Sequence, residues 1–421
     1  MFRTLSRVAL ALAFASTLDA QPAQSVPPRP PAGVATVDPL HQSGANVTIS
    51  LLTMGSGTQV WEMFGHNALL IHDNVTGRDT VFNWGVFSFK QPNFIARFLQ
   101  GRMLYAMGSD SLRWVEIAYT YLNRSVVAQE LDLTTSQKDS LLAQVQWYGL
   151  PENVNYRYDY FRDNCSTRVR DILDHVLNGQ FRAGANGPTG TTYRWHALRL
   201  MQGDRPLALG VDIALGRLTD KELTKWEEMF LPRKLHDYAA SFQIRDSAGG
   251  TRPLVRGEVV MVKTSRGPEY AAPPSLWPWL FGAGVAVSGL FMLFAVRGAR
   301  RSAAVAFGIW STVAGLLGLV LTLLWAATDH VSAYANENLL LFNPLWLLLT
   351  APLFISMWKG EVSVWTRRLA VAVAALSVVA LLVHVFRLSS QDNLALIGLA
   401  LPPALAIAWT TVRARTVSSR A

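Results

Sequence analysis

The chain has 421 residues, of which half are hydrophobic, a formal net charge of +9 and a single cysteine. This length allows two or three domains, and one cysteine excludes an internal disulfide. Much of the positive charge lies in short arginine clusters between long apolar runs after residue 275, a pattern that indicates membrane topology. No nucleic-acid-binding motif is present, so we expect no nucleic-acid partner.

Residues 1–20 have the pattern of a secretory signal peptide. Arg3 and Arg7 precede an apolar run over residues 8–15, and residues 18–20 form a possible cleavage end. An uncleaved anchor is the alternative, but the run is short for a membrane span. Residues 21–43 are rich in proline, glutamine, serine and alanine and are predicted to be a disordered linker.

Residues 44–270 have the mixed pattern of an α+β domain. Strands are expected over 47–54, 68–71, 80–85 and 124–133, and the middle two form a hairpin around a turn at 73–77. Helices are expected over 94–104 and over 135–150, and the second of these begins after a Thr-Thr-Ser cap.

The stretch from Tyr156 to Thr167 contains the single cysteine, Cys165. Alternating tyrosines before it predict a strand. Apolar residues spaced three and four apart after it predict one face of a helix, with Ser166 and Thr167 available as caps. A helix N-terminus lowers the pKa of a thiol and favours the thiolate. A buried, unreactive cysteine is the alternative.

Residues 271–421 are predicted to form an all-α membrane domain. Its five candidate spans are 276–296, 303–327, 340–358, 369–386 and 394–412. Basic clusters follow the first, third and fifth spans, so the positive-inside rule places the globular domain and the loop 328–338 on the outer face. Together with the signal peptide, this predicts a multi-pass membrane protein whose globular domain lies on the outer face.

A nucleophilic cysteine needs a base and a group that orients the base. His66 immediately precedes the strand 68–71, and Asn83 lies on the return strand of the same hairpin. Cys165, His66 and Asn83 are therefore a candidate catalytic set. The thiolate would attack a carbonyl, His66 would transfer the proton, Asn83 would fix the imidazole, and helix-start amides would stabilise the oxyanion. A core or turn histidine is the alternative for His66.

Three further residues are candidates for substrate binding, namely Asn164, His72 and His330. His72 lies on the same strand as His66, and His330 shares the outer loop 328–338 with Glu337. A solvated loop is the alternative for the residues of that loop. No HExxH or paired CxxC motif and no phosphate-binding loop is present in the sequence, so we expect neither a metal nor a cofactor.

Several motifs resemble a known family. Residues 64–69 (Phe-Gly-His-Asn-Ala-Leu), 82–85 (Phe-Asn-Trp-Gly) and 158–167 are similar to the extracytoplasmic domain of Lnb-type lipoprotein N-acyltransferases. Segments 229–232 and 338–344 extend the resemblance to residues 45–345. The order of histidine before cysteine resembles the permuted papain-like thiol enzymes of the lecithin retinol acyltransferase group. In that group a second histidine often occupies the position of Asn83.

The resemblance implies a permuted papain-like domain with acyltransferase activity, on the outer/periplasmic side of a multi-pass protein of the bacterial cytoplasmic (inner) membrane. An Lnb-type enzyme moves a fatty acyl chain from the diacylglyceryl group of a membrane lipoprotein to the amine of its N-terminal cysteine. Membrane lipids and lipoproteins would be the acyl donor and acceptor, and a Cys165 thioester would be the intermediate. Two other interpretations remain: a membrane-anchored cysteine hydrolase acting on a peptide or ester, and a non-catalytic membrane sensor or scaffold.

Overall fold

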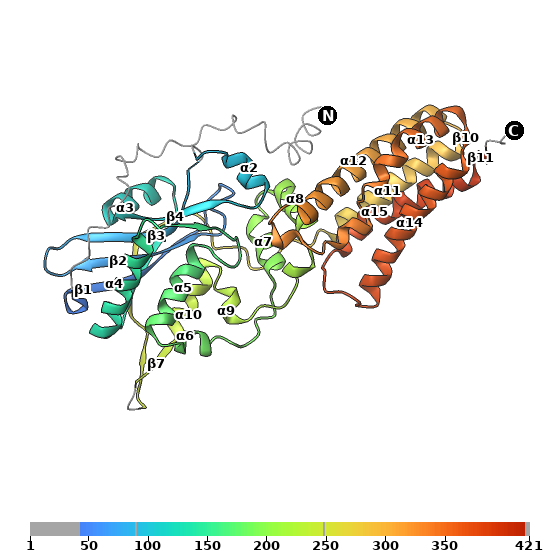
Figure 1. Cartoon of the computed structure of the whole chain (residues 1–421). Coiled ribbons are helices and arrows are strands. Elements are labelled where there is room, and N and C mark those ends of the chain that lie inside the picture. Colours follow the sequence, from blue (N-terminus) through green and yellow to red (C-terminus); the bar gives the residue numbers. More distant parts are fainter. Residues whose placement is uncertain (1–42, 89–90, 247–248, 417–421) are drawn as a thin grey trace. The chain divides into compact units, whose positions relative to one another are not determined.

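The computed structural model describes residues 43–88, 91–246 and 249–416. The predicted signal peptide and all but the last residue of the predicted linker lie outside the described residues. The chain divides into two compact units (Figure 1). Unit 1 comprises the described parts of Met1–His196 and Glu222–Ala271, and unit 2 those of Ala197–Lys221 and Ala272–Ala421.

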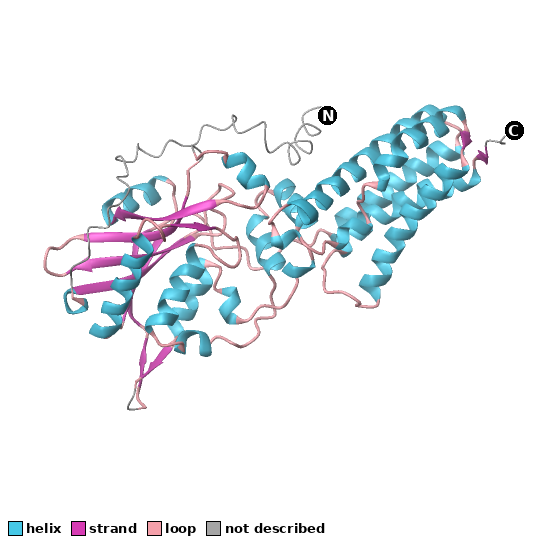
Figure 2. Ribbon diagram, viewed as in Figure 1, coloured by secondary structure: helices cyan, strands magenta, loops and turns pink. Residues whose placement is uncertain are grey.

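Unit 1 is built on a seven-stranded antiparallel sheet (Figure 2). Its strands are β1 (Val47–Met54), β2 (His66–Asp73), β3 (Asp79–Val86), β4 (Leu104–Ser111), β5 (Val126–Leu131), β6 (Asn155–Arg157) and β9 (Val255–Val262). They lie in the order β6-β4-β3-β2-β1-β5-β9. The predicted hairpin is confirmed, because β2 pairs with β3 and Ala68 faces Asn83 across that pair.

Helices cover both faces of this sheet (Figure 1). The helices of this part of the chain are α2 (Phe94–Leu99), α3 (Leu112–Tyr121), α4 (Thr135–Gly149), α5 (Cys165–Val176), α6 (Gln180–Ala183), α7 (Tyr193–Met201), α9 (Lys225–Glu228) and α10 (Pro232–Ser241). A small hairpin joins β7 (Gln243–Arg245) to β8 (Thr251–Pro253). The mixed α+β class predicted from the sequence is therefore confirmed.

Strand alternation divides the core of unit 1 into two layers. On β1, Ile49 and Leu51 pack in the layer that contains residues of α4, α5 and α10, whereas Leu52 and Met54 pack in the layer that contains Val115 of α3. Successive side chains of a strand point to opposite faces, so one apolar strand supplies both layers. The sheet is consequently covered on both sides, with α5 fixed against one of them.

Two local predictions in unit 1 are wrong. The helix expected over 94–104 ends at Leu99, because Gly101 takes the left-handed conformation (φ +70°) that closes a helix, and the chain then enters β4. The N-cap of the cysteine helix is Asn164; Thr167 completes a capping box by accepting the backbone N–H of Asn164 at 2.7 Å, and Ser166 lies inside the first turn. In addition, β4 and α3 were not predicted, because the polar and glycine-containing sequence of β4 lacks a clear apolar alternation.

Unit 2 contains the five predicted spanning helices. They are α11 (Trp277–Val296), α12 (Arg300–Ala327), α13 (Leu345–Lys359), α14 (Val364–Val385) and α15 (Leu394–Arg413). Within the described chain all five candidate spans meet the length and hydropathy of a membrane helix, the third when η4 (Glu337–Leu340) is included. A Cβ on Gly284 of α11 would lie 2.3 Å from the carbonyl oxygen of Gly398 on α15, so small residues permit this close packing.

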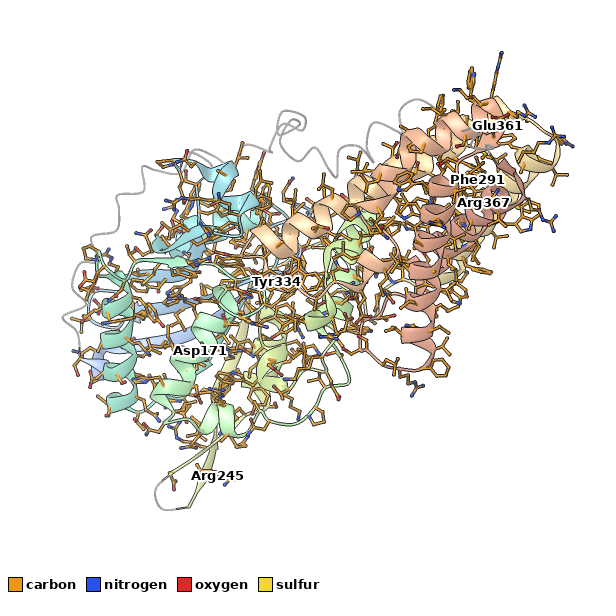
Figure 3. All side chains as sticks on the ribbon, turned by 45° about the vertical axis from the view of Figure 1, so that its right-hand side comes forward. Asp171, Arg245, Phe291, Tyr334, Glu361 and Arg367 are labelled. Atoms are coloured by element: carbon orange, nitrogen blue, oxygen red, sulfur yellow. The ribbon has the colours of Figure 1, made fainter. Side chains whose placement is uncertain are left out.

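Aromatic packing joins the first two spans. Phe291 of α11, labelled in Figure 3, lies with its ring centroid 4.8 Å from that of Phe307 on α12. Both side chains are buried. A two-residue pair, β10 (Glu361–Val362) with β11 (Arg415–Thr416), links the turn after α13 to the end of α15.

A buried amide network holds α8 (Arg205–Ala214) within unit 2. The Nδ2 of Asn336 donates to the carbonyl oxygens of Ile213 and Ala214 at 2.9 and 3.0 Å, and the Nδ2 of Asn338 donates to Ile213 at 3.0 Å. The Nδ2 of Asn393 donates to Asn338 Oδ1 at 3.2 Å. The last carbonyls of a helix have no partner inside it, and these amides supply one. We call this set the amide clamp.

Candidate active site

The N-terminus of α5 is fixed by the side chain of Asn164. Its Oδ1 accepts the backbone N–H groups of Ser166 and Thr167, both at 2.9 Å, while its Nδ2 donates to the carbonyl oxygens of Tyr160 and Phe230. Both ends of this buried amide are therefore bound by the protein itself. The arrangement places Cys165 at the first helical position, and substrate binding by Asn164 stays a prediction.

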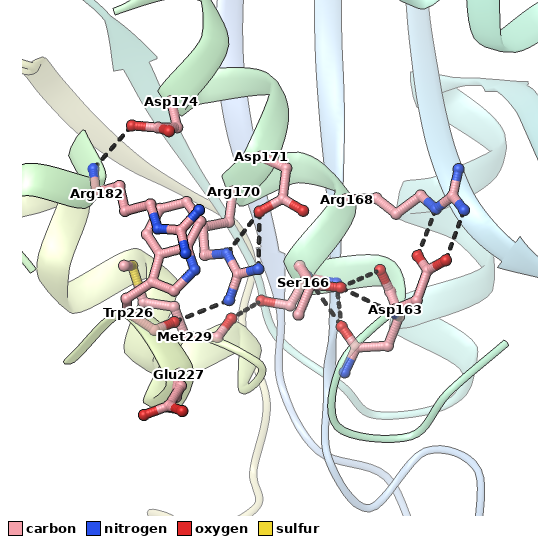
Figure 4. Close-up of polar contacts among 12 residues, drawn as sticks. Asp163, Ser166, Arg168, Arg170, Asp171, Asp174, Arg182, Trp226, Glu227 and Met229 are labelled. Carbon is pink, nitrogen blue, oxygen red and sulfur yellow. Dashed lines mark hydrogen bonds and ion pairs between the residues drawn. The ribbon is translucent and has the colours of Figure 1, made fainter. Parts of the chain in front are cut away.

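Further polar contacts secure the same turn of α5, as Figure 4 shows. The hydroxyl of Ser166 donates to the carbonyl oxygen of Met229 at 2.7 Å. Arg168 donates through Nε and Nη2 to both carboxylate oxygens of Asp163, at 2.6 and 2.7 Å. Bidentate pairs of this kind restrict orientation as well as distance. The loop before Cys165 and the helix after it are thus held together.

The position of His66 follows from the glycine before it. Gly65 has φ +79°, and a Cβ there would lie 2.8 Å from the carbonyl oxygen of Met54. Only glycine fits this conformation and this contact without strain. The chain then enters β2 at His66, which faces Met54 in the antiparallel register. Asn83 on β3 is hydrogen-bonded through its side chain to the imidazole of His66.

Cys165 and His66 border the same small space beside Gly85. A Cβ on Gly85 would lie 3.8 Å from Cys165 Cβ, 4.0 Å from His66 Cε1 and 3.7 Å from Tyr158 Cε2. The register of β3 against β4 shifts between Trp84 and Val86, so Gly85, with φ +94°, forms a bulge. The structure therefore brings Cys165, His66 and Asn83 together, with Gly85 beside both Cys165 and His66.

The electrostatics of the site favour neutral forms of both groups. Desolvation by burial, followed by the positive charge of Arg124, lowers the pKa of His66 to about 4, although the hydrogen bond that the imidazole donates to the Asn83 side chain opposes this shift. Burial raises the pKa of the Cys165 thiol, and backbone N–H groups of Asn67, Ser166 and Cys165 partly offset it. At neutral pH the pair is consequently a thiol beside an imidazole that is free to accept a proton.

Arg124 is a site residue that the sequence did not reveal. Its buried side chain donates through Nε to the carbonyl oxygen of Gly55 at 2.8 Å, and Nη1 lies 3.5 Å from Glu62 Oε1. The guanidinium also lies over the ring of Tyr119, 4.7 Å from its centroid. Its charge acts on both His66 and Cys165. Only the fold reveals this role, since Arg124 is distant from both residues in the sequence.

Tyrosines form a second set of side chains that the sequence left without a role. Tyr105 and Tyr158 stack with centroids 4.2 Å apart, and Tyr160 meets Tyr158 edge-on at 5.9 Å. Burial, and then the charge of a Cys165 thiolate, raise the pKa of Tyr105 to about 12. The pKa of Tyr158 is raised well above its ordinary value for the same reasons. These phenols stay neutral, and the stacked rings of Tyr105 and Tyr158 form one wall of the site.

The remaining predicted residues lie elsewhere. His72 is six residues along β2 from His66, which corresponds to about 20 Å along an extended strand, and its Nδ1 is paired with Asp79 at 2.8 Å. His330 belongs to unit 2, where its N–H donates to Thr328 Oγ1 at 3.3 Å. In the same unit, the N–H of Glu337 donates to Gln391 Oε1 at 2.8 Å. Substrate binding by His72 and His330 stays a prediction.

The fold and the composition define a multi-pass membrane protein that carries an antiparallel α+β domain on its N-terminal side. The Lnb N-terminal periplasmic domain matches residues 42–198, and the Lnb transmembrane domain matches residues 272–407. The chain belongs to the Lnb family, a family of lipoprotein N-acylation, and its N-terminal domain is periplasmic. No curated protein and no solved structure matches it.

Proposed function

We propose that this protein is a thiol-dependent acyltransferase that carries a fatty acyl chain on Cys165 and passes it to the N-terminal amine of a lipoprotein. The observation that carries the proposal is the shared space beside Gly85, bordered by Cys165 and by a His66 that Asn83 orients. A nucleophile, a base and an orienting group within one site are the requirements of covalent acyl transfer. Family membership supports the acyl chain as the group transferred.

The first half-reaction loads the enzyme. His66 takes the proton of the Cys165 thiol as the sulfur attacks the ester carbonyl of a membrane diacylglyceryl donor. The tetrahedral intermediate then collapses, the C–O bond breaks, and the imidazolium gives its proton to the departing alkoxide. The products are an acyl thioester on Cys165 and a lyso form of the donor, with His66 again neutral.

The second half-reaction transfers the acyl group from Cys165 to the acceptor. The amine of the acceptor attacks the thioester carbonyl, His66 takes a proton from the amine, and the C–S bond breaks. The thiolate recovers the proton from the imidazolium, and the acceptor leaves as an amide. The low pKa of His66, about 4, keeps the imidazole unprotonated before each attack. Backbone N–H groups at the start of α5 are suited to stabilise the oxyanion.

The test measures lipoprotein N-termini by mass spectrometry in a bacterium whose own lipoprotein N-acylation is absent. Cells that express the wild-type chain are expected to carry N-acylated lipoproteins, whereas cells that express Cys165→Ala or His66→Ala are not. Immunodetection in the membrane fraction verifies that each variant is inserted. An identical acylation state in all three strains overturns the proposal.

A second measurement separates transferase from hydrolase. The purified full chain is incubated in detergent with a diacylglyceryl lipopeptide, and its intact mass is followed before and after hydroxylamine. We expect a hydroxylamine-labile acyl adduct on the wild type, and amide-linked product when an amine acceptor is present. Release of free fatty acid at the same rate with and without acceptor would instead support a cysteine hydrolase.

A further inference from the structure

The helix α2 has exposed apolar side chains. None of its six residues is buried; Ile95 is 47% exposed and Leu99 is 55% exposed. Trp61, whose ring contacts Phe87 as the ring of Phe94 does, is 53% exposed. A helix of six residues gains little stability on its own. We call Trp61, Phe94, Ile95, Phe98 and Leu99 the contact surface.

The contact surface is continuous with the wall of the active site. Phe98 stacks on Phe94 with centroids 6.4 Å apart, and Phe94 stacks on Phe87 at 6.3 Å. Trp61 meets the same Phe87 edge-on at 6.3 Å. Phe87 therefore contacts both Trp61 and, through Phe94, the helix α2.

From Phe87 the aromatic chain reaches the thiol. The ring of Tyr105 lies 5.1 Å from that of Phe87, and Tyr158 stacks on Tyr105 at 4.2 Å. Tyr158 in turn borders the space beside Gly85 that Cys165 also borders. A single series of rings, which we call the aromatic array, thus runs from exposed apolar residues to the reactive sulfur.

The charge of this region fits the surface of a bilayer. No acidic residue occurs between Asp79 and Asp110, whereas Lys90, Arg97 and Arg102 fall within that stretch. Arg97 lies on α2 itself, and both arginines are exposed. Basic residues beside exposed aromatic and aliphatic side chains are typical of segments that rest in the headgroup region of anionic membranes. The same chain also carries five candidate spanning helices.

We propose that the contact surface inserts into the outer leaflet of the cytoplasmic membrane and that the aromatic array guides a lipid acyl chain from the leaflet to Cys165. The proposed membrane contact rests only on the exposed apolar side chains of the contact surface and on the positive charge beside them. The guidance of an acyl chain rests on the proposed transferase function. In this arrangement the chain passes from lipid to thiol along apolar rings without crossing water.

The single native cysteine makes the membrane contact directly measurable. In a Cys165→Ser background the full chain receives Ile95→Cys or Leu99→Cys, is labelled with a nitroxide and is reconstituted into vesicles of phosphatidylethanolamine and phosphatidylglycerol. Val75→Cys, at a 72% exposed apolar residue outside any helix, is the matched control. We expect a ratio of oxygen to nickel-chelate accessibility several-fold higher at positions 95 and 99 than at position 75. Equal ratios at all three positions overturn the membrane contact.

A second arm tests the passage of the acyl chain. The double variant Ile95→Asn with Leu99→Asn is expected to lower the rate of Cys165 acylation by a vesicle-bound lipid several-fold. Its acylation by a short water-soluble ester should be unchanged, as should both rates in Val75→Asn. Equal loss with both donors overturns guidance by the array. If the wild type is acylated by neither donor, the transferase function fails, and the nitroxide result still decides the membrane contact.

Discussion

The side chain of Asn83 is hydrogen-bonded to the imidazole of His66 across the β2–β3 pair. Strand alternation explains the contact: Ala68 and Val81 belong to the same core layer, so His66 and Asn83, each two residues away, point to the same face of the sheet. The base and its partner thus come from one hairpin, while the nucleophile comes from a helix about eighty residues later in the chain.

Replacing Asn83 should impair catalysis more than folding. We expect Asn83→Ala to lower the rate of Cys165 acylation about 10²-fold, because the imidazole loses the group that fixes its orientation. Asn83→His places a ring nitrogen at this position and should retain part of the rate that Asn83→Ala loses. Single-turnover adduct formation, followed by intact mass, is the measurement. An unchanged rate in Asn83→Ala would show that the hydrogen bond has no role in the chemistry.

Cys165 should react slowly at neutral pH. Burial raises the pKa of its thiol above the ordinary value of 9.0, so the thiolate fraction of the folded chain at pH 8 is below that of the unfolded chain. We expect iodoacetamide to alkylate the folded chain more slowly than the urea-unfolded chain, with a rate that still rises above pH 9. Since the chain has one cysteine, total adduct mass reports this site alone. A plateau near pH 7 in the folded chain would contradict a raised pKa.

The sequence predicted the parts of the site that depend on local patterns. The alternating apolar residues of β1 and the turn of the β2–β3 hairpin are local signals, and so is the apolar face of α5. These signals were sufficient to predict that His66, Asn83 and Cys165 form one candidate catalytic set. They failed at the cap of α5, because Asn164 is chosen over Ser166 by its additional bonds to the carbonyls of Tyr160 and Phe230.

The rest of the site depends on contacts between distant segments. Arg124 influences His66 and Cys165 only because β5 lies next to β1, whose last residue faces His66. Tyr105 reaches Tyr158 only because β4 pairs with β6, and β4 itself was missed. A pattern within a window of ten or twenty residues contains no information about such pairings.

The low pKa of His66 should make the folded chain sensitive to acid. The unfolded chain binds a proton at this residue near pH 6.5 and the folded chain only near pH 4, so between these values the unfolded state holds more protons and stability falls as pH falls. The loss is on the order of 3 kcal/mol by pH 4. We expect the difference in Tm between wild type and His66→Gln, measured in detergent, to shift against the wild type from pH 7 to pH 4. A constant difference would contradict the linkage.

Gly85 should be required for both conformation and space. Gly85→Ala places a Cβ at φ +94° and into van der Waals contact with both Cys165 Cβ and His66 Cε1. The conformational strain costs on the order of 1–3 kcal/mol, and we expect acylation to be lost as well. Gly77→Ala is the matched control: Gly77 has φ +69°, and no atom lies within 4 Å of the place that a Cβ would take, so stability should fall while acylation persists. Normal acylation in a folded Gly85→Ala chain would place the reaction outside this space.

The amide clamp should determine whether α8 stays within unit 2. Asn338 is fully buried; its removal takes away one of the two side-chain bonds to the carbonyl oxygen of Ile213 and the bond that Asn393 Nδ2 donates to Asn338. A buried polar group without a partner costs about 1–3 kcal/mol. We therefore expect Asn338→Ala to accelerate amide hydrogen exchange in residues 205–219 and to lower the Tm.

Asn343 offers a matched control for this prediction. It is also a buried asparagine of unit 2, but neither polar atom of its side chain has a hydrogen-bond partner among the described residues. Replacing it with an apolar residue of similar size removes two unsatisfied groups, so Asn343→Leu should leave the exchange of residues 205–219 unchanged and should not lower the Tm. If both variants accelerate exchange in that segment equally, α8 is held by general packing of unit 2 and the specific amide bonds contribute nothing.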